Sequence, residues 1–335
     1  MNMRAWFRSQ IESPVKKAMP VLSFPSVGLL DVSVIELISS ADQQAEGMRR
    51  IAERCDTAAA VSMMDLSVEA DCFGSNIRYA EEDVPTVIGG IVSTPEEADA
   101  LPVPAVGSGR TGQYIEAIRK AKEAITDRPV FAGVIGPFSL AGRLMDVSEA
   151  MLYCYDDPDM VHTVLTKVSE FLTAYILAYR EVGADGVVIA EPLAGLLSPD
   201  LAAEFSATYV KQIIAAVQTE DFIVIYHNCG GSTIQTIDSI RTNGAAAYHF
   251  GNAIRMADML PLFPADVPVL GNVDPAGEFC NGTPASIRER TLSLLEECSQ
   301  YPNFIISSGC DIPPRTPWAN IDAYFAAVAD FYAAK

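Results

Sequence analysis

The chain alternates short apolar runs with longer amphipathic segments, and this alternation constrains its fold more than any other feature of the sequence. Apolar residues recur at helical spacing between the runs, most clearly over residues 33–54, 157–182 and 198–218. The runs show no regular polar alternation, which is typical of parallel strands buried on both faces. The pattern predicts an α/β fold, a (β/α)8 TIM barrel that forms a single domain over residues 1–335. Its eight strands are expected at residues 19–24, 58–63, 129–135, 186–190, 222–226, 245–248, 267–270 and 304–306.

Two segments depart from the barrel repeat. Residues 3–18 are polar with spaced apolar positions, which predicts an N-terminal helical extension on the outside of the barrel. Residues 71–112 are irregular and rich in Gly, Pro and Asp, with a short hairpin expected at 76–90. Structureless connections of this length are commonly lids or binding loops, so we expect a long insertion over the barrel mouth.

Charge and cysteine content exclude several classes of protein. The net charge of −20, from 23 basic and 43 acidic residues, argues against binding to nucleic acid or to anionic membranes. No apolar run is long enough to span a bilayer, and charged residues interrupt the N-terminal segment where a signal peptide would lie. The seven cysteines are scattered and odd in number, which favours free thiols or metal ligands over disulfides. We therefore expect a cytoplasmic enzyme.

Three metal-binding side chains follow predicted strands. His227 and Cys229 come directly after the fifth strand, and Cys310 follows the eighth. Alternate residues of an extended segment point the same way, so His227 and Cys229 can both face the mouth. A lone His-x-Cys pair is more often ordinary packing, but imidazole and thiolate suit zinc, and their places at strand ends favour a metal site. Three protein ligands are typical of a catalytic zinc, and Glu191 after the fourth strand is a candidate fourth, displaceable ligand.

Other polar residues stand at the same end of the predicted strands, which in this fold is the mouth where active sites lie. His249 is a candidate contact of a ligand or of the substrate. Asp65 is expected to face the mouth, whereas Glu69 is assigned to a solvated loop. Further candidates after strands are Asn272, Asp274 and Asp311.

Several of these segments resemble one family, the uroporphyrinogen decarboxylase superfamily, and within it the methylcobamide:coenzyme M methyltransferase branch. The resemblance covers nearly the whole chain and implies zinc on His227, Cys229 and Cys310, with Glu191 able to complete the coordination. Asp65, Glu191 and Asp274 would orient ligands or acceptor, while Asn272, His249 and Asp311 would contact the substrate. The resemblance rests on Met64 to Ala70, Gly136-Pro137-Phe138, Ala190-Glu191-Pro192, His227-Asn228-Cys229-Gly230, Gly271-Asn272-Val273-Asp274-Pro275 and Gly309-Cys310-Asp311-Ile312-Pro313.

The resemblance implies transfer of a methyl group from a methylated corrinoid to a small thiol such as coenzyme M, with tetrahydrofolate as another possible acceptor. A zinc-bound thiol is deprotonated and would attack the methyl group. The chain has no Asp-x-His-x-x-Gly corrinoid signature; around His162 it reads Asp159-Met160-Val161-His162-Thr163-Val164-Leu165. The corrinoid is therefore expected on a separate partner protein that docks over the mouth.

Two alternatives remain. A uroporphyrinogen decarboxylase would carry an arginine-rich segment near residues 24–30, but this stretch contains neither arginine nor an acidic residue. A substrate with many carboxylates would also fit poorly in an acidic protein without a basic mouth. The other alternative is a non-catalytic, zinc-holding partner of a corrinoid protein, and an open ligand position argues against it.

Overall fold

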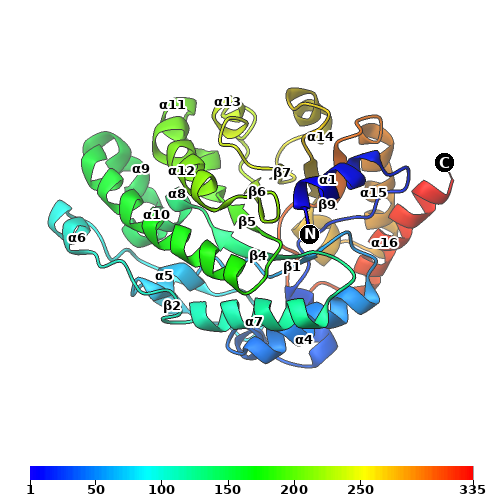
Figure 1. The fold of residues 1–335 in the computed structure, drawn as a ribbon, viewed down its shortest axis with the longest axis horizontal. Coiled ribbons are helices and arrows are strands. Elements are labelled where there is room, and N and C mark those ends of the chain that lie inside the picture. Colours follow the sequence, from blue (N-terminus) through cyan, green and yellow to red (C-terminus); the bar gives the residue numbers. More distant parts are fainter. Residues whose placement is uncertain (335) are drawn as a thin grey trace.

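Seven parallel strands form a strongly curved sheet at the centre of the structure, and helices surround it (Figure 1). The computed structural model describes residues 1–334. Neighbouring strands pair in the order β1-β4-β5-β6-β7-β8-β9, so each strand lies beside the next one along the chain. This is the TIM-barrel-like α/β fold that the alternating pattern predicts. The strands are β1 Ala60–Val61, β4 Val130–Ile135, β5 Gly186–Ala190, β6 Ile223–Asn228, β7 Ala247–Phe250, β8 Val269–Val273 and β9 Phe304–Ser308.

Residues 18–22 occupy the eighth position of the barrel without forming a regular strand. The Met19 amide donates to the carbonyl of Ile306 in β9 at 3.0 Å, and on the other side the Ala58 amide donates to the carbonyl of Ala18 at 2.8 Å. Pro20 has no amide hydrogen, so it cannot continue a ladder. The next donor, the Val21 amide, bonds the side-chain oxygen of Ser308 instead. The strand predicted at residues 19–24 is therefore replaced by an irregular seam between β9 and β1.

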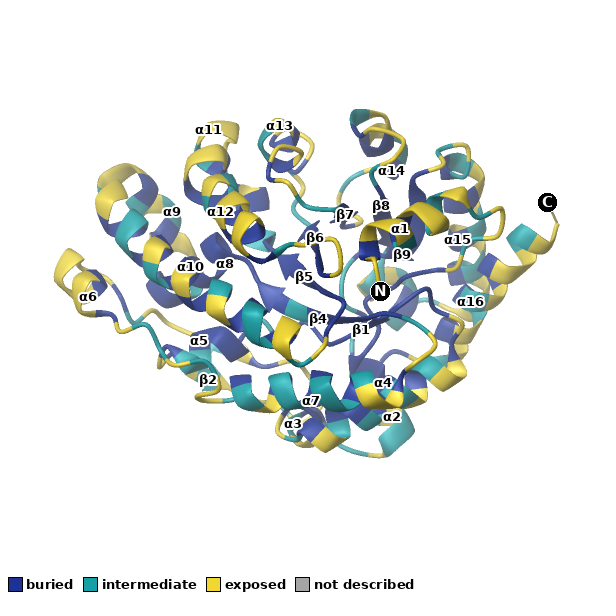
Figure 2. Cartoon of the chain, in the orientation of Figure 1, coloured by how far each residue is buried: buried dark blue, intermediate teal, exposed yellow. Residues whose placement is uncertain are grey.

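The strands alternate between an inner core and an outer core. In β6, Ile223 and Ile225 point into the barrel, whereas Val224 and Tyr226 pack against the surrounding helices. Helix α1 (Met3–Glu12) closes one end, because its Met3 and Phe7 belong to the inner core. It ends before the predicted residue 18, since Pro14 follows its last turn. Figure 2 shows the buried strands enclosed by helices whose outer faces are exposed.

The surrounding helices follow the predicted order but are more finely divided. The helix predicted over residues 33–54 is two helices, because the Ser40 side chain caps a new start. The helix predicted over 198–218 contains a π turn. The two helices over residues 137–156 were not predicted. The helices are α2 Val27–Leu30, α3 Val34–Ile38, α4 Ala41–Arg54, α5 Val68–Cys72, α6 Pro95–Ala100, α7 Thr111–Ala124, α8 Pro137–Met145, α9 Val147–Asp156, α10 Pro158–Glu181, α11 Pro199–Ala202, α12 Thr208–Val217, α13 Ile237–Ile240, α14 Met256–Met259, α15 Pro284–Cys298 and α16 Trp318–Ala333, with the short turns η1 Phe24–Ser26, η2 Pro192–Leu196, η3 Ala203–Ala207, η4 Leu260–Leu262 and η5 Pro275–Cys280.

The insertion after the first strand contains the predicted hairpin. Strands β2 (Asn76–Arg78) and β3 (Thr86–Ile88) pair antiparallel, and α6 follows them. Arg110, at the end of the insertion, contacts the carboxylates of Asp65 and Asp71, and its guanidinium lies 5.4 Å from the centre of the Tyr79 ring. These contacts hold the insertion against the barrel. Within residues 1–334, no helix has both the length and the apolar character required to cross a membrane.

Candidate metal centre and cavity

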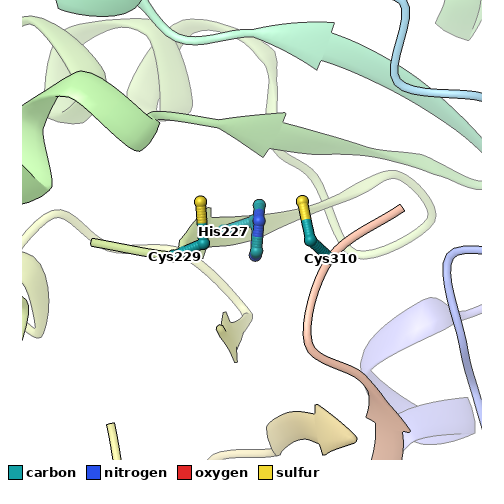
Figure 3. A group of neighbouring side chains, drawn as sticks. All are labelled: His227, Cys229 and Cys310. Carbon is teal, nitrogen blue, oxygen red and sulfur yellow. The ribbon is translucent and has the colours of Figure 1, made fainter. Parts of the chain in front are cut away.

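His227, Cys229 and Cys310 meet at the carboxyl end of the strands. One ligand atom from each residue lies within 4.8 Å of the corresponding atoms of the other two. His227 belongs to β6 and continues the inward alternation of Ile223 and Ile225, and Cys229 follows two residues later. Figure 3 shows the imidazole between the two cysteines, whose sulfurs point the same way. The structure thus assembles the three side chains that the sequence selects as metal ligands, here called the ligand group.

A chain of hydrogen bonds behind the ligand group determines which nitrogen of His227 is free. Ser307 donates its hydroxyl proton to the Met19 carbonyl at 2.8 Å, so it must accept from Nε2 of His249, also at 2.8 Å. Burial lowers the pKa of His249 well below its usual value, so this ring is neutral and its Nδ1 can only accept. The proton between the two rings therefore sits on Nδ1 of His227, 2.7 Å from Nδ1 of His249.

Nε2 of His227 is left with a lone pair and nothing to bond. The atom is buried and has no hydrogen-bond partner among the described residues. The backbone carbonyl of His249, 3.2 Å from Nδ1 of His227, favours the same tautomer. A buried imidazole lone pair without a partner is costly, whereas a metal ion would satisfy it.

The two thiols shift each other's pKa in opposite directions, so that one thiolate is favoured and a second is disfavoured. The pKa of Cys310 is raised to about 12, because Cys229 beside it and burial both disfavour a second thiolate. A hydrogen bond from Cys310 lowers the pKa of Cys229. A divalent cation would remove this conflict by allowing both sulfurs to be thiolates. Two sulfurs and one unprotonated imidazole nitrogen are a donor set that fits zinc.

The hydrogen-bond chain leads to a prediction for His249→Ala. Removing the closer acceptor of the His227 proton, the imidazole of His249, should weaken zinc binding by roughly 10–100-fold, the usual loss when a partner behind a metal ligand is removed, because only the more distant backbone carbonyl of residue 249 would remain. Chelator competition on the zinc-loaded protein would measure this. His249→Asn, which keeps an acceptor oxygen in the side chain, should recover part of the affinity. His162→Ala is the matched control, since His162 lies near the start of α10, outside the ligand group, and bonds Tyr209 and Glu204. Equal zinc affinity in wild type and His249→Ala would show that the imidazole of His249 is not needed to hold the proton of His227.

A cavity of about 300 Å³ opens directly onto the ligand group. Asp83 and Val84, in the loop between β2 and β3, close part of it, so the insertion does reach over the mouth. Asp311 lines the same space. The volume is at the small end of ligand-binding pockets, so it suits a small molecule. Its apolar walls are formed by Phe24, Met64, Leu66, Val84, Pro192 and Ile312.

Glu191 lies beside the ligand group in the sheet but faces the other way. Its carboxylate accepts bonds from the amides of Phe138 at 3.0 Å and Ser139 at 2.6 Å, and from the hydroxyl of Ser206 at 3.1 Å. These amides are at the start of α8, where a carboxylate is favourable. Burial raises the pKa of Glu191. The predicted fourth ligand is thus engaged with α8 and is not among the residues that meet at the ligand group.

Of the other predicted site residues, Asp311 lines the cavity. Its Oδ2 accepts from the Met64 amide at 2.7 Å, Oδ1 is buried without a hydrogen-bond partner among the described residues, and burial raises its pKa well above the usual value. Asn272 donates to the carbonyls of Gly251 and Ile254, and Asp274 caps η5. His249 lies behind His227. Asp65 accepts from Tyr114 at 2.7 Å and contacts Arg110, away from the cavity.

The assignment of Glu69 to a solvated loop is wrong. The residue is 2% exposed, lies in α5, and accepts from the Ile135 amide at 3.1 Å. Burial raises its pKa to about 7. The folded protein therefore binds the Glu69 proton more tightly than the unfolded chain does.

This shift predicts the pH dependence of Glu69→Gln. The stabilisation from a protonated Glu69 is complete below about pH 4.5 and is lost as the pH rises through about 7, because only the folded state holds the proton there. At 1.36 kcal/mol per pKa unit the loss is about 3 kcal/mol. Urea unfolding measures the free energy of unfolding at pH 5 and at pH 8. Its decrease between these two pH values should therefore be smaller in Glu69→Gln than in wild type. The exposed control Glu12→Gln should keep the wild-type decrease, and an unchanged decrease in Glu69→Gln would contradict the assignment.

The sequence analysis did not predict that Ser307 bonds His249, or that Asp83 and Val84 line the cavity. Ser307 follows Ile305 by two residues on β9, and Ile305 faces the inner core, so the strand alternation could have revealed it. Nothing in the local pattern marks Asp83 and Val84. Their place depends on how far the hairpin folds over the mouth.

Comparisons with known proteins agree with this architecture. A family model described as Uroporphyrinogen decarboxylase (URO-D) matches residues 25–331. The methylcobamide:CoM methyltransferase MtbA of Methanosarcina acetivorans is 27% identical over 323 residues, which cover 91% of this chain and 92% of the relative. A uroporphyrinogen decarboxylase of Coxiella burnetii is 29% identical over 287 residues, covering 82% of this chain and 77% of the relative. A solved structure described as a methyltransferase from Methanosarcina mazei superposes with a TM-score of 0.86 at 23% identity, over 99% of this chain and 98% of the other.

Proposed function

The chain belongs to the uroporphyrinogen decarboxylase family, and within this family we propose that it is a zinc-dependent methyltransferase that moves a methyl group from a methylated corrinoid protein to a small thiol. The ligand group carries this proposal, because two thiols and an unpartnered imidazole nitrogen open onto a small apolar cavity. The similarity to methylcobamide:CoM methyltransferases, over nine-tenths of the chain, supports methyl transfer. Coenzyme M is the acceptor in those names, and tetrahydrofolate is the other candidate.

The chemistry requires a nucleophilic sulfur and a methyl group in line with it. Zinc, when bound by His227, Cys229 and Cys310, would lower the pKa of an acceptor thiol so that it reacts as a thiolate. The apolar walls exclude water from the reacting atoms. In this transfer the acceptor sulfur would form a bond to the methyl carbon as the carbon–cobalt bond of the donor breaks, and the electron pair would remain on the donor's cobalt, which would pass from Co(III) to Co(I). The thiol proton leaves to solvent.

Glu191 and Asp65 are proposed to hold other parts of the site in place without contacting the substrate. Glu191 would have to leave three hydrogen bonds to reach the ligand group, so we assign it to holding α8 beside Pro192, which lines the cavity. Asp65 similarly anchors the insertion through Arg110. Asp311, which lines the cavity, is proposed to contact the acceptor. The corrinoid partner would approach over the hairpin. All seven cysteines are free, in keeping with a reducing, cytoplasmic setting.

Decarboxylation is the second candidate, because decarboxylases are also among the relatives. Its substrate carries many carboxylates, but no lysine or arginine lines the cavity within the described residues. A purely zinc-holding role is disfavoured by the open cavity beside the ligand group. The observed site therefore favours methyl transfer.

The test uses methylcobalamin as a simple methyl donor. Zinc-loaded protein with a small thiol should convert it to cob(I)alamin, which is followed by the corrinoid absorbance. Protein stripped with a chelator should be inactive, and added zinc should restore the reaction. Zinc-loaded protein that demethylates nothing, or that decarboxylates uroporphyrinogen, would contradict the proposal.

A further inference from the structure

We infer that the methyl acceptor carries no negative charge beside its thiol, so that a neutral or cationic small thiol is preferred over an anionic one. This inference rests on the proposed function and narrows its substrate class. Coenzyme M, 2-mercaptoethanesulfonate, is anionic, because a sulfonate stands two carbons from its sulfur. The described residues that line the cavity of this chain offer such a group no basic side chain.

The charge of the cavity wall is the first observation. Among the described residues that line it, none is lysine or arginine, whereas two are acidic, Asp83 and Asp311. Asp83 exposes 64% of its side chain. Oδ1 of Asp311 is buried without a hydrogen-bond partner within residues 1–334, and its carboxyl offers no positive charge in either protonation state. An anionic group beside the thiol would thus meet no positive charge in this wall, while a hydroxyl or ammonium group would find acceptor oxygens.

Arg315, in the groove beside the cavity, is already paired with acidic residues. Arg315 lies 3.5 Å from the carboxylate of Glu82 and 3.6 Å from that of Asp83. Both acids come from the hairpin loop, so Arg315 faces two negative charges on the outer side of the cavity. It lines the neighbouring groove and not the cavity that opens onto the ligand group.

Two half-buried arginines near the mouth do not reach the cavity either. Arg110 contacts both Asp65 and Asp71. Arg143 donates to the carbonyl of Ser139 at 3.2 Å. Neither residue lines the cavity, so no basic side chain of the described residues stands in its wall to meet an acceptor anion.

The experiment compares three thiols of the same length on the zinc-loaded protein. These are 2-mercaptoethanesulfonate, 2-mercaptoethanol and 2-aminoethanethiol, which differ in the charge of one end group. Calorimetric titration gives each Kd without requiring turnover, and methylcobalamin turnover gives kcat/KM. We expect the anionic thiol to bind roughly tenfold more weakly than the neutral one.

Two variants separate the charge of the wall from the intrinsic acidity of each thiol. In Asp83→Asn the ratio of anionic to neutral Kd should fall by roughly threefold. The acidity of the thiols cancels, because the same pair is compared in two proteins. An unchanged ratio of the two Kd values would show that the charge of Asp83 does not cause the weaker binding of the anionic thiol, which would overturn the inference. If Arg315 moved to hold the sulfonate, the wild type would prefer the anionic thiol and Arg315→Gln would lose that preference, which would also overturn the inference.

The outcomes distinguish this inference from the proposed function. Equal or tighter binding of the anionic thiol overturns the charge rule and leaves thiol methylation in place. Failure of all three thiols to bind zinc-loaded protein overturns thiol methylation and the charge rule together. Weaker binding of the anionic thiol, relieved in Asp83→Asn, supports both.

Discussion

Cys310→Ala is expected to abolish the stoichiometric zinc binding proposed for the ligand group and, with it, the proposed methyl transfer to thiols. Cys310 is one of only three donors that meet at the ligand group within the described chain, so two remain, and both come from the same strand end. We expect the zinc affinity to fall by more than about 100-fold, since loss of a partner that does not touch the metal already costs roughly 10–100-fold. Metal content after dialysis, together with the rate of cob(I)alamin formation, measures both effects.

The matched control is Cys280→Ala, which removes a free thiol from η5, outside the ligand group. It should retain about one zinc per chain, the single site that the three donors define. Circular dichroism and thermal unfolding of metal-free proteins would show whether Cys310→Ala still folds. A folded Cys310→Ala protein with full zinc content and activity would refute the assignment of this residue as a ligand.

Asp65→Ala is expected to produce the largest loss of stability among the predicted site residues. The Asp65 side chain is fully buried, Arg110 beside it is 12% exposed, and the variant leaves the arginine charge without its closest partner. Breaking a buried ion pair from one side typically costs 3–5 kcal/mol, so we expect an unfolding free energy lower by about 4 kcal/mol. The hydrogen bond from Tyr114 is lost as well. Denaturant unfolding of the metal-free protein measures the change.

The control for this prediction is Asp71→Ala, which removes the second and more exposed acid on the same arginine. Its cost should be smaller, about 1 kcal/mol, because the Asp71 side chain is 26% exposed and Arg110 retains its closest partner, Asp65. Folded Asp65→Ala protein should still bind zinc, because the residue faces Arg110 and not the ligand group. Normal stability with loss of zinc would instead indicate that Asp65 serves the metal directly.

The barrel and the ligand group were predictable because both depend on simple periodicities. Apolar runs between helical segments give a parallel sheet, and alternate residues at the end of β6 bring His227 and Cys229 to one side. The same rule explains the place of Glu191. Residues 188 and 190 face the inner core, so residue 191 is directed toward the helices, and counting along β5 could have shown this.

What the sequence could not show depends on contacts between distant segments. The irregular seam follows from one missing amide hydrogen at Pro20 and from the competing side chain of Ser308. Glu69 was misplaced because the polar segment around it hides the burial that α8 and the barrel impose. The acids at the cavity rim depend on the fold of the hairpin over the mouth, which no local pattern specifies.

The irregular seam between β9 and β1 is connected to the ligand group by hydrogen bonds. The hydrogen-bond chain that orients His227 ends on the carbonyl of Met19, within the one position of the barrel that lacks a regular ladder. Occupancy of the ligand group and closure of the seam are therefore thermodynamically linked, since a ligand that favours one arrangement of His227 also favours the seam that supports it. A metal ion bound by the ligand group would therefore stabilise the irregular seam between β9 and β1.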